Sequence, residues 1–114
     1  MVNLLDETLE KIKANGKSIE EIKFVMAETV RVKNGMTYPF EEYMNWEDFA
    51  EQADKIYDDG YGGNEVKMGL KIIGKNWWLE RHEYDGAEWW EFKQIPKKPK
   101  KYNKFNPFVK DGEY

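Results

Sequence analysis

His82 is the only histidine of the chain, and Glu80 and Glu91 are near it in the sequence. An imidazole beside two carboxylates could hold a metal ion or transfer a proton. A stable metal site, however, needs three or four converging ligands, and a histidine stacked on a neighbour such as Trp89 explains the pattern more simply. We therefore predict no metal, no cofactor and no catalytic residue. A small metal-dependent enzyme built around His82 is the weakest alternative.

Other catalytic chemistries lack their residues. There is no cysteine to act as a nucleophile or thiolate ligand, and Ser18 is the sole serine, in a helix-capping position. The glycine-rich stretch Asp58–Glu65 has no Lys-Ser/Thr after it, so it does not match a phosphate-binding loop. Its acids do not have calcium-loop spacing either. This stretch is predicted to be a connection, and the chain is predicted not to be an enzyme.

Acidic residues dominate positions 41–65, where nine acids stand against one base, Lys55. Four of these acids, from Glu47 to Asp58, recur at steps of four, three and four, which on one helix places them in a line about 16 Å long. Charge runs are usually solvated helix faces. The scarcity of compensating lysines favours the alternative that this line imitates a nucleic-acid backbone and occupies a basic groove. The predicted partner-binding residues are Glu41, Glu42, Glu47, Asp48, Glu51, Asp54, Asp58, Asp59 and Glu65.

An aromatic surface offers a rival function. Exposed rings could stack on unpaired bases while lysines of the C-terminal tail contact phosphates. The negative body opposes direct nucleic-acid binding, and an uncovered tryptophan face would equally serve as a homodimer interface. The residues of this secondary face are Trp78, His82, Tyr84 and Trp89.

The element that would position these side chains is a hairpin over residues 76–95. Asp85-Gly86 between two aromatic-rich, alternating runs predicts a two-residue turn, with Tyr84 paired to Ala87. Glu80 then lies opposite Glu91, which is unfavourable unless a cation lies between them. We expect Lys71, from a preceding strand at 66–73, to supply that cation. The core face would carry Trp77, Leu79, Arg81, Trp90 and Phe92, with Arg81 stacked on Trp90.

The remaining elements predict an α+β fold. Asparagine caps begin helices near 4–15 and 45–58, and Ser18 opens a capping box. Residues 19–32 fit either a helix or a strand, and we favour one helical turn followed by a strand over 23–32. Asn34-Gly35 then predicts a hairpin with a short return over 36–38, because Pro39 limits an edge strand. We expect a small antiparallel sheet, a three-stranded meander that this hairpin could extend, packed against two α-helices.

Charge divides the chain into two parts. Residues 1–95 hold 12 basic and 20 acidic side chains, a net charge of −8, whereas residues 96–114 hold six lysines and two acids. We predict one α+β domain over 1–95 and a basic, proline- and lysine-rich tail over 96–114. No stretch has the length and apolarity of a membrane span, and no signal pattern is present. The expectation is a cytoplasmic protein of a bacterial cell.

The run from Trp77 to Phe92, after Gly60-Tyr-Gly-Gly63, resembles small accessory proteins of phages and prophages of Gram-positive bacteria. The likeness covers residues 45–98 and carries over no catalytic residue. Such proteins include anti-CRISPR and other anti-defence inhibitors, several of which resemble DNA in charge. The resemblance implies a non-enzymatic inhibitor whose partner is a basic, nucleic-acid-binding host protein or nuclease.

Overall fold

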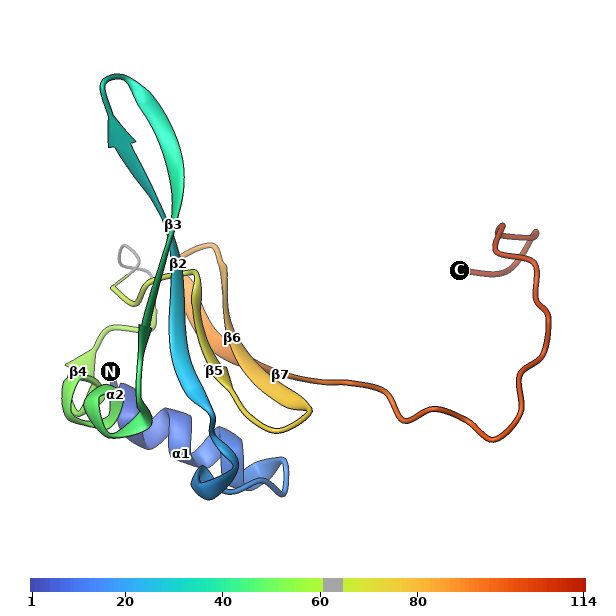
Figure 1. Ribbon diagram of the computed structural model, residues 1–114, viewed down its shortest axis with the longest axis horizontal. Coiled ribbons are helices and arrows are strands. Elements are labelled where there is room, and N and C mark those ends of the chain that lie inside the picture. The colour runs from blue at the N-terminus through green and yellow to red at the C-terminus, as the bar shows by residue number, and fades with distance from the viewer. Residues whose placement is uncertain (61–64) are drawn as a thin grey trace.

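A computed structural model of the protein describes residues 1–60 and 65–114 and has an α+β architecture (Figure 1). Five antiparallel strands form the main sheet in the order β3-β2-β5-β6-β7, and β1 pairs with β4 in a separate two-stranded sheet. The elements are β1 (Val2–Asn3), α1 (Leu4–Ala14), the 3₁₀ helix η1 (Ile19–Glu21), β2 (Phe24–Lys33), β3 (Met36–Met44), α2 (Trp46–Ala53), β4 (Ile56–Tyr57), β5 (Leu70–Ile73), β6 (Trp77–Tyr84) and β7 (Ala87–Gln94).

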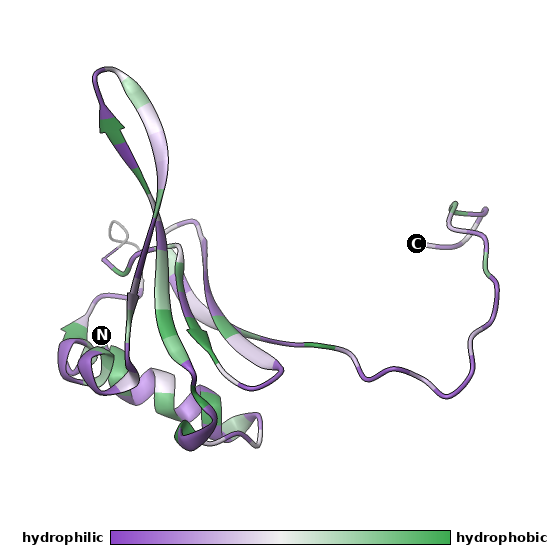
Figure 2. Ribbon diagram, viewed as in Figure 1, coloured by the Kyte–Doolittle hydropathy of each residue, from purple (hydrophilic) through white to green (hydrophobic). Residues whose placement is uncertain are grey.

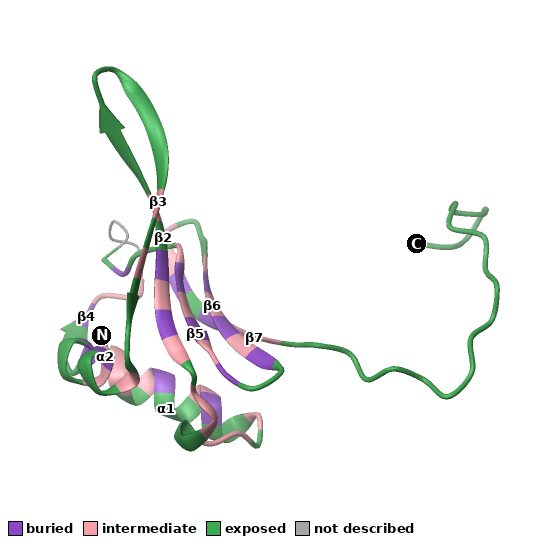
Figure 3. Cartoon of the chain, in the orientation of Figure 1, coloured by how far each residue is buried: buried purple, intermediate pink, exposed green. Residues whose placement is uncertain are grey.

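The core lies between one face of the main sheet and the two α-helices. Ile12 of α1 and Phe49 of α2 join the buried sheet residues in a single hydrophobic cluster. We call this side of the sheet the covered face, and Figure 3 shows the buried segments gathered there. The predicted layer arrangement, two helices against one apolar sheet face, is therefore confirmed. The strand residues of the covered face that belong to the cluster are Val25, Ala27, Leu70, Ile72, Trp77, Leu79 and Trp90.

Both predicted hairpin turns are present. Asn34 and Gly35 have φ angles of 52° and 76°, and Asp85 and Gly86 have φ angles of 51° and 84°. Positive φ at both central residues defines the turn whose twist matches that of the flanking strands, and Asn-Gly and Asp-Gly adopt it most readily. The resulting register pairs Tyr84 with Ala87, as predicted.

Local capping signals also place the first helices correctly. The Asn3 side chain accepts a hydrogen bond from the Asp6 amide, and the Asn45 side chain does the same for Asp48. Ser18 forms the predicted capping box with Glu21 around η1. Residues 24–33 after this short turn form a strand, so the strand prediction over 23–32 is confirmed.

The predicted helix over 45–58 is wrong at its C-terminal end. Helix α2 stops at Ala53, and the chain turns so that Ile56 and Tyr57 pair with the N-terminal strand β1. Tyr57 fits a helical apolar stripe by its spacing. It is instead buried as a strand residue, because its ring and hydroxyl find partners in the core that a longer helix would not reach.

The predicted short return over 36–38 is also wrong, because β3 continues through Pro39 to Met44. Lys33 and Met36 form the pair that closes the two-residue turn, so the backbone groups of Pro39 point to the outer edge of the sheet. A missing N–H at that edge removes no bond to β2. The strand predicted over 66–73 is shorter than expected and spans Leu70–Ile73.

Two segments extend away from the packed body. Strand β5 pairs with β2 only over residues 24–27, so residues 28–41 continue as a two-stranded projection, which we call the arm (Figure 1). Figure 2 shows hydrophobic residues along the arm, and Val30 and Val32 are 69% and 71% exposed. The tail leaves β7 and runs away from the domain, exposed throughout (Figure 3).

Candidate functional site

The β6–β7 hairpin presents two chemically different faces. Side chains alternate along each strand, so the register places one set against the helices and the other on the opposite side of the sheet. We call this opposite side the open face, since no helix packs on it in the described part of the chain (Figure 1). Its residues are Phe24, Met26, Glu28, Glu41, Tyr43, Lys71, Ile73, Trp78, Glu80, His82, Tyr84, Trp89, Glu91 and Lys93.

His82 lies between the two opposed glutamates of the open face. Its Nε2 is 2.8 Å from Glu80 Oε2, and its Nδ1 is 2.6 Å from Glu91 Oε2. The imidazole also stacks on the Trp89 ring, with centroids 6.4 Å apart. The predicted cation, Lys71, is opposite Glu80 in register but pairs with Glu28 instead, at 3.2 Å. The imidazole, and not the predicted Lys71, therefore lies between the two glutamates.

Glu80 of this cluster has a further donor. Trp78 donates its indole N–H to Glu80 at 2.8 Å, and this bond is the main reason why the pKa of Glu80 lies below its ordinary value. Both ring nitrogens of His82 already face carboxylates, which leaves neither one directed at an external substrate or metal. Among the described residues, no group of three or more His, Cys, Asp or Glu side chains has a geometry suited to a metal ion.

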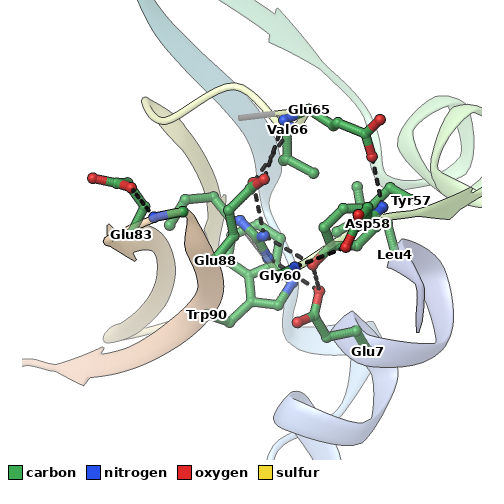
Figure 4. A network of polar contacts seen from close by, with 12 residues as sticks. Leu4, Glu7, Tyr57, Asp58, Gly60, Glu65, Val66, Glu83, Glu88 and Trp90 are labelled. Atoms are coloured by element: carbon green, nitrogen blue, oxygen red, sulfur yellow. Dashed lines mark hydrogen bonds and ion pairs between the residues drawn. The ribbon is translucent and has the colours of Figure 1, made fainter. Parts of the chain in front are cut away.

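Arg81, the preceding residue, forms a second cluster on the covered face (Figure 4). Its guanidinium contacts Glu7 Oε1 at 3.1 Å, Glu88 Oε1 at 3.3 Å and the Tyr57 hydroxyl at 3.0 Å. It also lies 4.9 Å from the ring centre of Trp90, so the predicted stacking of Arg81 on Trp90 is confirmed. Burial disfavours the charged guanidinium, yet Tyr57 and Glu7 keep the pKa of Arg81 above its ordinary value.

Sequence reasoning missed Glu7 and Tyr57 as partners of Arg81, and it also missed Glu88. The Glu88 side chain is fully buried and also accepts the backbone N–H groups of Glu65 and Val66. The signal was present in the hairpin register, because Glu88 is two residues before Trp90 and therefore shares its face. The cluster holds Glu65 and Val66 against the hairpin, which gives it a structural role.

The predicted partner-binding acids of β3 do not form a common surface. Glu41 belongs to the open face, where it accepts a hydrogen bond from the Tyr43 hydroxyl, whereas Glu42 points to the other side of the strand. Glu42 is already paired with Lys67 at 2.9 Å and Arg31 at 3.5 Å. The hydrogen bond from Lys67 is the main cause that lowers the pKa of Glu42.

The predicted straight line of four acids is also wrong, because α2 ends before it is complete. Glu47, Asp48 and Glu51 are exposed on the helix, and Asp54 is its C-cap, where it accepts a hydrogen bond from Asn3. The remaining three predicted acids follow the helix in the chain and are Asp58, Asp59 and Glu65. Asp58 accepts from the Gly60 amide, Glu65 accepts from the Asp58 amide, and the Asp59 carbonyl accepts from Glu88.

A groove of about 600 Å³ lies between α2, β4 and the segment before β5. Its floor is mainly apolar, with Phe49 and Leu70 among its lining residues, and Lys55, Glu65 and Lys67 contribute charged groups. Neither His82 nor Arg81 lines the groove, although Tyr57, a partner of Arg81, does. Its composition suits apolar contact better than proton transfer.

Comparisons with known proteins identify no relative: no family model, no curated protein and no solved structure matches this chain. Within the described residues, no helix is long and apolar enough to cross a membrane. The functional assignment therefore depends on the geometry of the molecule alone.

Proposed function

We propose that the protein is a non-enzymatic inhibitor of phage type, which binds a basic, nucleic-acid-binding protein of a bacterial host through the acids of residues 47–59. The observation that carries this proposal is the lack of counter-ions. Among the described residues, none of the six acids between 47 and 59 takes part in an ion pair, although five glutamates of the main sheet do. Carboxylates without a cation of their own gain most from an oppositely charged partner.

The position of two of these acids strengthens the argument. Glu51 is in the last turn of α2 and Asp54 caps its C-terminus, and that turn contains no basic residue. Negative charge at a helix C-terminus opposes the helix dipole at a cost of about 0.3–1 kcal/mol per group. Acids in the N-terminal turn, such as Glu47 and Asp48, interact favourably with the helix dipole instead. A basic partner surface would offset the unfavourable placement.

The test is a pull-down from a Gram-positive host lysate at low and high salt, followed by identification of the bound protein. The wild-type chain should retain a basic nucleic-acid-binding protein at low salt and lose it at high salt. The purified target should then release its nucleic acid when the wild-type protein is added, which distinguishes inhibition from simple adhesion.

The double variant Glu47→Lys/Glu51→Lys changes two exposed acids one helical turn apart on α2. It should weaken target binding at least about tenfold. Asp6→Lys/Glu10→Lys is the matched control, since these residues hold the equivalent first-turn and next-turn positions on α1 and change the net charge equally. Equal loss in both variants would show a general charge effect, and unchanged binding in the α2 variant would exclude this surface.

Single-stranded nucleic-acid binding is the second candidate. Tyr84 is 77% exposed on the open face, and Tyr102, Phe105 and Phe108 are exposed among the tail lysines, as expected for base stacking with phosphate contacts. Glu80 and Glu91 between the face's aromatic rings oppose a phosphate backbone, which places this function second. Recovery of nucleic acid without a basic protein in the same pull-down would reverse the order.

A further inference from the structure

The open face is a surface that the proposed inhibitory function does not use. Trp89 is 37% exposed and Tyr43 is 60% exposed, and no residue of this face is buried in the described chain. The tail runs away from it, and both α-helices pack on the other side of the sheet (Figure 1). Exposed aromatic side chains gathered on one face, among paired charges, are typical of an interface.

Its charged side chains on β2, β5, β6 and β7 have partners within the chain, whereas Glu41 on β3 accepts only a hydrogen bond from the Tyr43 hydroxyl. Lys71 meets Glu28, His82 lies between Glu80 and Glu91, and Lys93 is 3.9 Å from Glu91. A surface whose ions carry their own partners can be covered without leaving a lone charge. The open face therefore differs from the acids of 47–59, which need an external cation.

The strand register makes the open face complementary to itself. Lys71 on β5 lies beside Glu80 on β6, and Ile73 lies beside Trp78 in the next row. A two-fold axis parallel to the strands and between β5 and β6 would place β5 of one copy over β6 of the other. Lys71 would then face Glu80 of the second copy, and Ile73 would face Trp78 of the second copy. Aligned sheets pack face to face at about 10 Å, a spacing that these side chains can span.

The arm continues this surface beyond the sheet. Val30 and Val32 are on the same side of β2 as Met26, so they extend the open face along the arm. Under the same two-fold axis, Val30 would lie over the β6–β7 turn of the second copy, beside its exposed Tyr84. An isolated two-stranded hairpin is only marginally stable in water. Contact with a second copy would stabilise the arm.

We propose that the protein is a symmetric homodimer in which the two open faces pack against each other and each arm reaches over the partner's β6–β7 turn. About this axis four strands of each copy overlap, because β3 lies beyond β7 of the second copy. Four strands about 4.8 Å apart and about six residues long give a plan area of roughly 400 Å². The accessible area is larger than this plan area, because side chains protrude from the sheet and the arm adds its own surface. Both bring it toward the roughly 800 Å² that each partner buries in a standard interface.

Sedimentation equilibrium of the full-length protein tests the dimer directly. The wild-type chain should show twice its mass of 13.6 kDa at micromolar concentration, and a monomer at all concentrations up to about 200 μM would overturn the proposal. Ile73→Asp should raise the dimer Kd at least about 30-fold, because it sets a charge against the tryptophan of the second copy. Ile56→Asp, at an isoleucine 56% exposed on β4, is the matched control and should leave the dimer intact. If Ile56→Asp weakened the dimer and Ile73→Asp did not, the interface would lie on the side of the molecule that carries the groove.

A charge exchange tests the register of the interface. Lys71→Glu alone and Glu80→Lys alone each place like charges across the two-fold axis, so both should be largely monomeric. An equimolar mixture of the two variants should form a heterodimer, since each altered residue then meets its opposite charge on the other chain. Mixing does not restore the ion pairs within either altered chain. Any recovered association must therefore come from contacts between the two chains. A mixture that stays monomeric while both variants retain their circular dichroism spectrum would contradict the proposed register.

This dimer does not depend on the inhibitory function. The variants at 71, 73 and 80 leave the acids of 47–59 unchanged, and the Glu47→Lys/Glu51→Lys variant leaves the open face unchanged. Loss of target binding without loss of the dimer, or the reverse, would therefore separate the two proposals.

Discussion

Arg81 and His82 are consecutive residues of β6 that point to opposite faces of the sheet, and each lies between two glutamates. Arg81 contacts Glu7 and Glu88 on the covered face, where its own side chain is fully buried. His82 contacts Glu80 and Glu91 on the open face, where about a third of each side chain is exposed. A basic side chain between two carboxylates thus occurs in two different environments.

The difference between the two clusters lies in desolvation. A buried cation must be matched by hydrogen bonds, and loss of one partner leaves an uncompensated charge in the interior. The Arg81 guanidinium has such partners on both terminal nitrogens, while its Nε has none among the described residues. An exposed pair contributes little, because water solvates either group when its partner is removed. The covered cluster should therefore hold the fold together, whereas the open cluster should govern surface recognition.

Arg81→Met should have the largest effect, lowering the free energy of unfolding by about 3–5 kcal/mol, because it leaves Glu88 charged and buried. Urea denaturation followed by tryptophan fluorescence would measure it. Arg81→Met/Glu88→Gln should recover part of the loss, since Gln removes the buried charge and keeps an acceptor oxygen for one of the Glu65 and Val66 amides, which donate to different oxygens of Glu88. If Arg81→Met lowered the free energy of unfolding by less than about 1 kcal/mol, the proposed contrast between the two faces would be wrong.

His82→Gln should lower the free energy of unfolding by less than about 1 kcal/mol, because its glutamates remain accessible to water. The same denaturation assay applies, at a concentration below the dimer Kd. A loss comparable to that of Arg81→Met would mean that exposure does not set the strength of these clusters.

Trp78→Phe should produce the smallest change, a rise in the pKa of Glu80 toward its ordinary value of 4.5. The lowered pKa of Glu80 in the folded protein stabilises it above about pH 4.5, and this contribution is lost as the pH falls through the folded-state pKa. Removal of the indole donor should therefore move acid unfolding to higher pH. Carbon-13 NMR titration of the Glu80 carboxyl would follow the pKa. Trp89→Phe serves as the control, because Trp89 stacks on His82 and makes no hydrogen bond to Glu80.

Sequence reasoning succeeded where structure is decided locally. Asn-Gly and Asp-Gly specify their turns through the few conformations that their own backbones favour, and the register of each hairpin follows from the turn. The caps at Asn3 and Asn45 are similarly local. The alternation of β6 and β7 then separated the two faces and correctly placed Arg81 on Trp90.

The predictions failed where contacts with segments distant in the sequence determine the conformation or the partner of a residue. Tyr57 satisfies a helical spacing, but β1, Glu7 and Arg81 hold it in a strand, and no local pattern encodes those partners. The acidic line was lost with the end of that helix. Similarly, the ionic partner of Lys71 proved to be Glu28 on β2, a neighbour that became visible only with the strand order of the complete sheet.

The pairing of β2 with β5 has a further consequence for the order of folding. Each hairpin is closed by a two-residue turn, so the β2–β3 and β6–β7 pairs can form within microseconds. The junction between β2 and β5 joins Ala27 to Leu70 and must close the long intervening chain, which includes α2 and β4. Closure of so long a loop costs entropy before its contacts are made. We therefore expect two preformed hairpins whose union at β5 sets the folding rate.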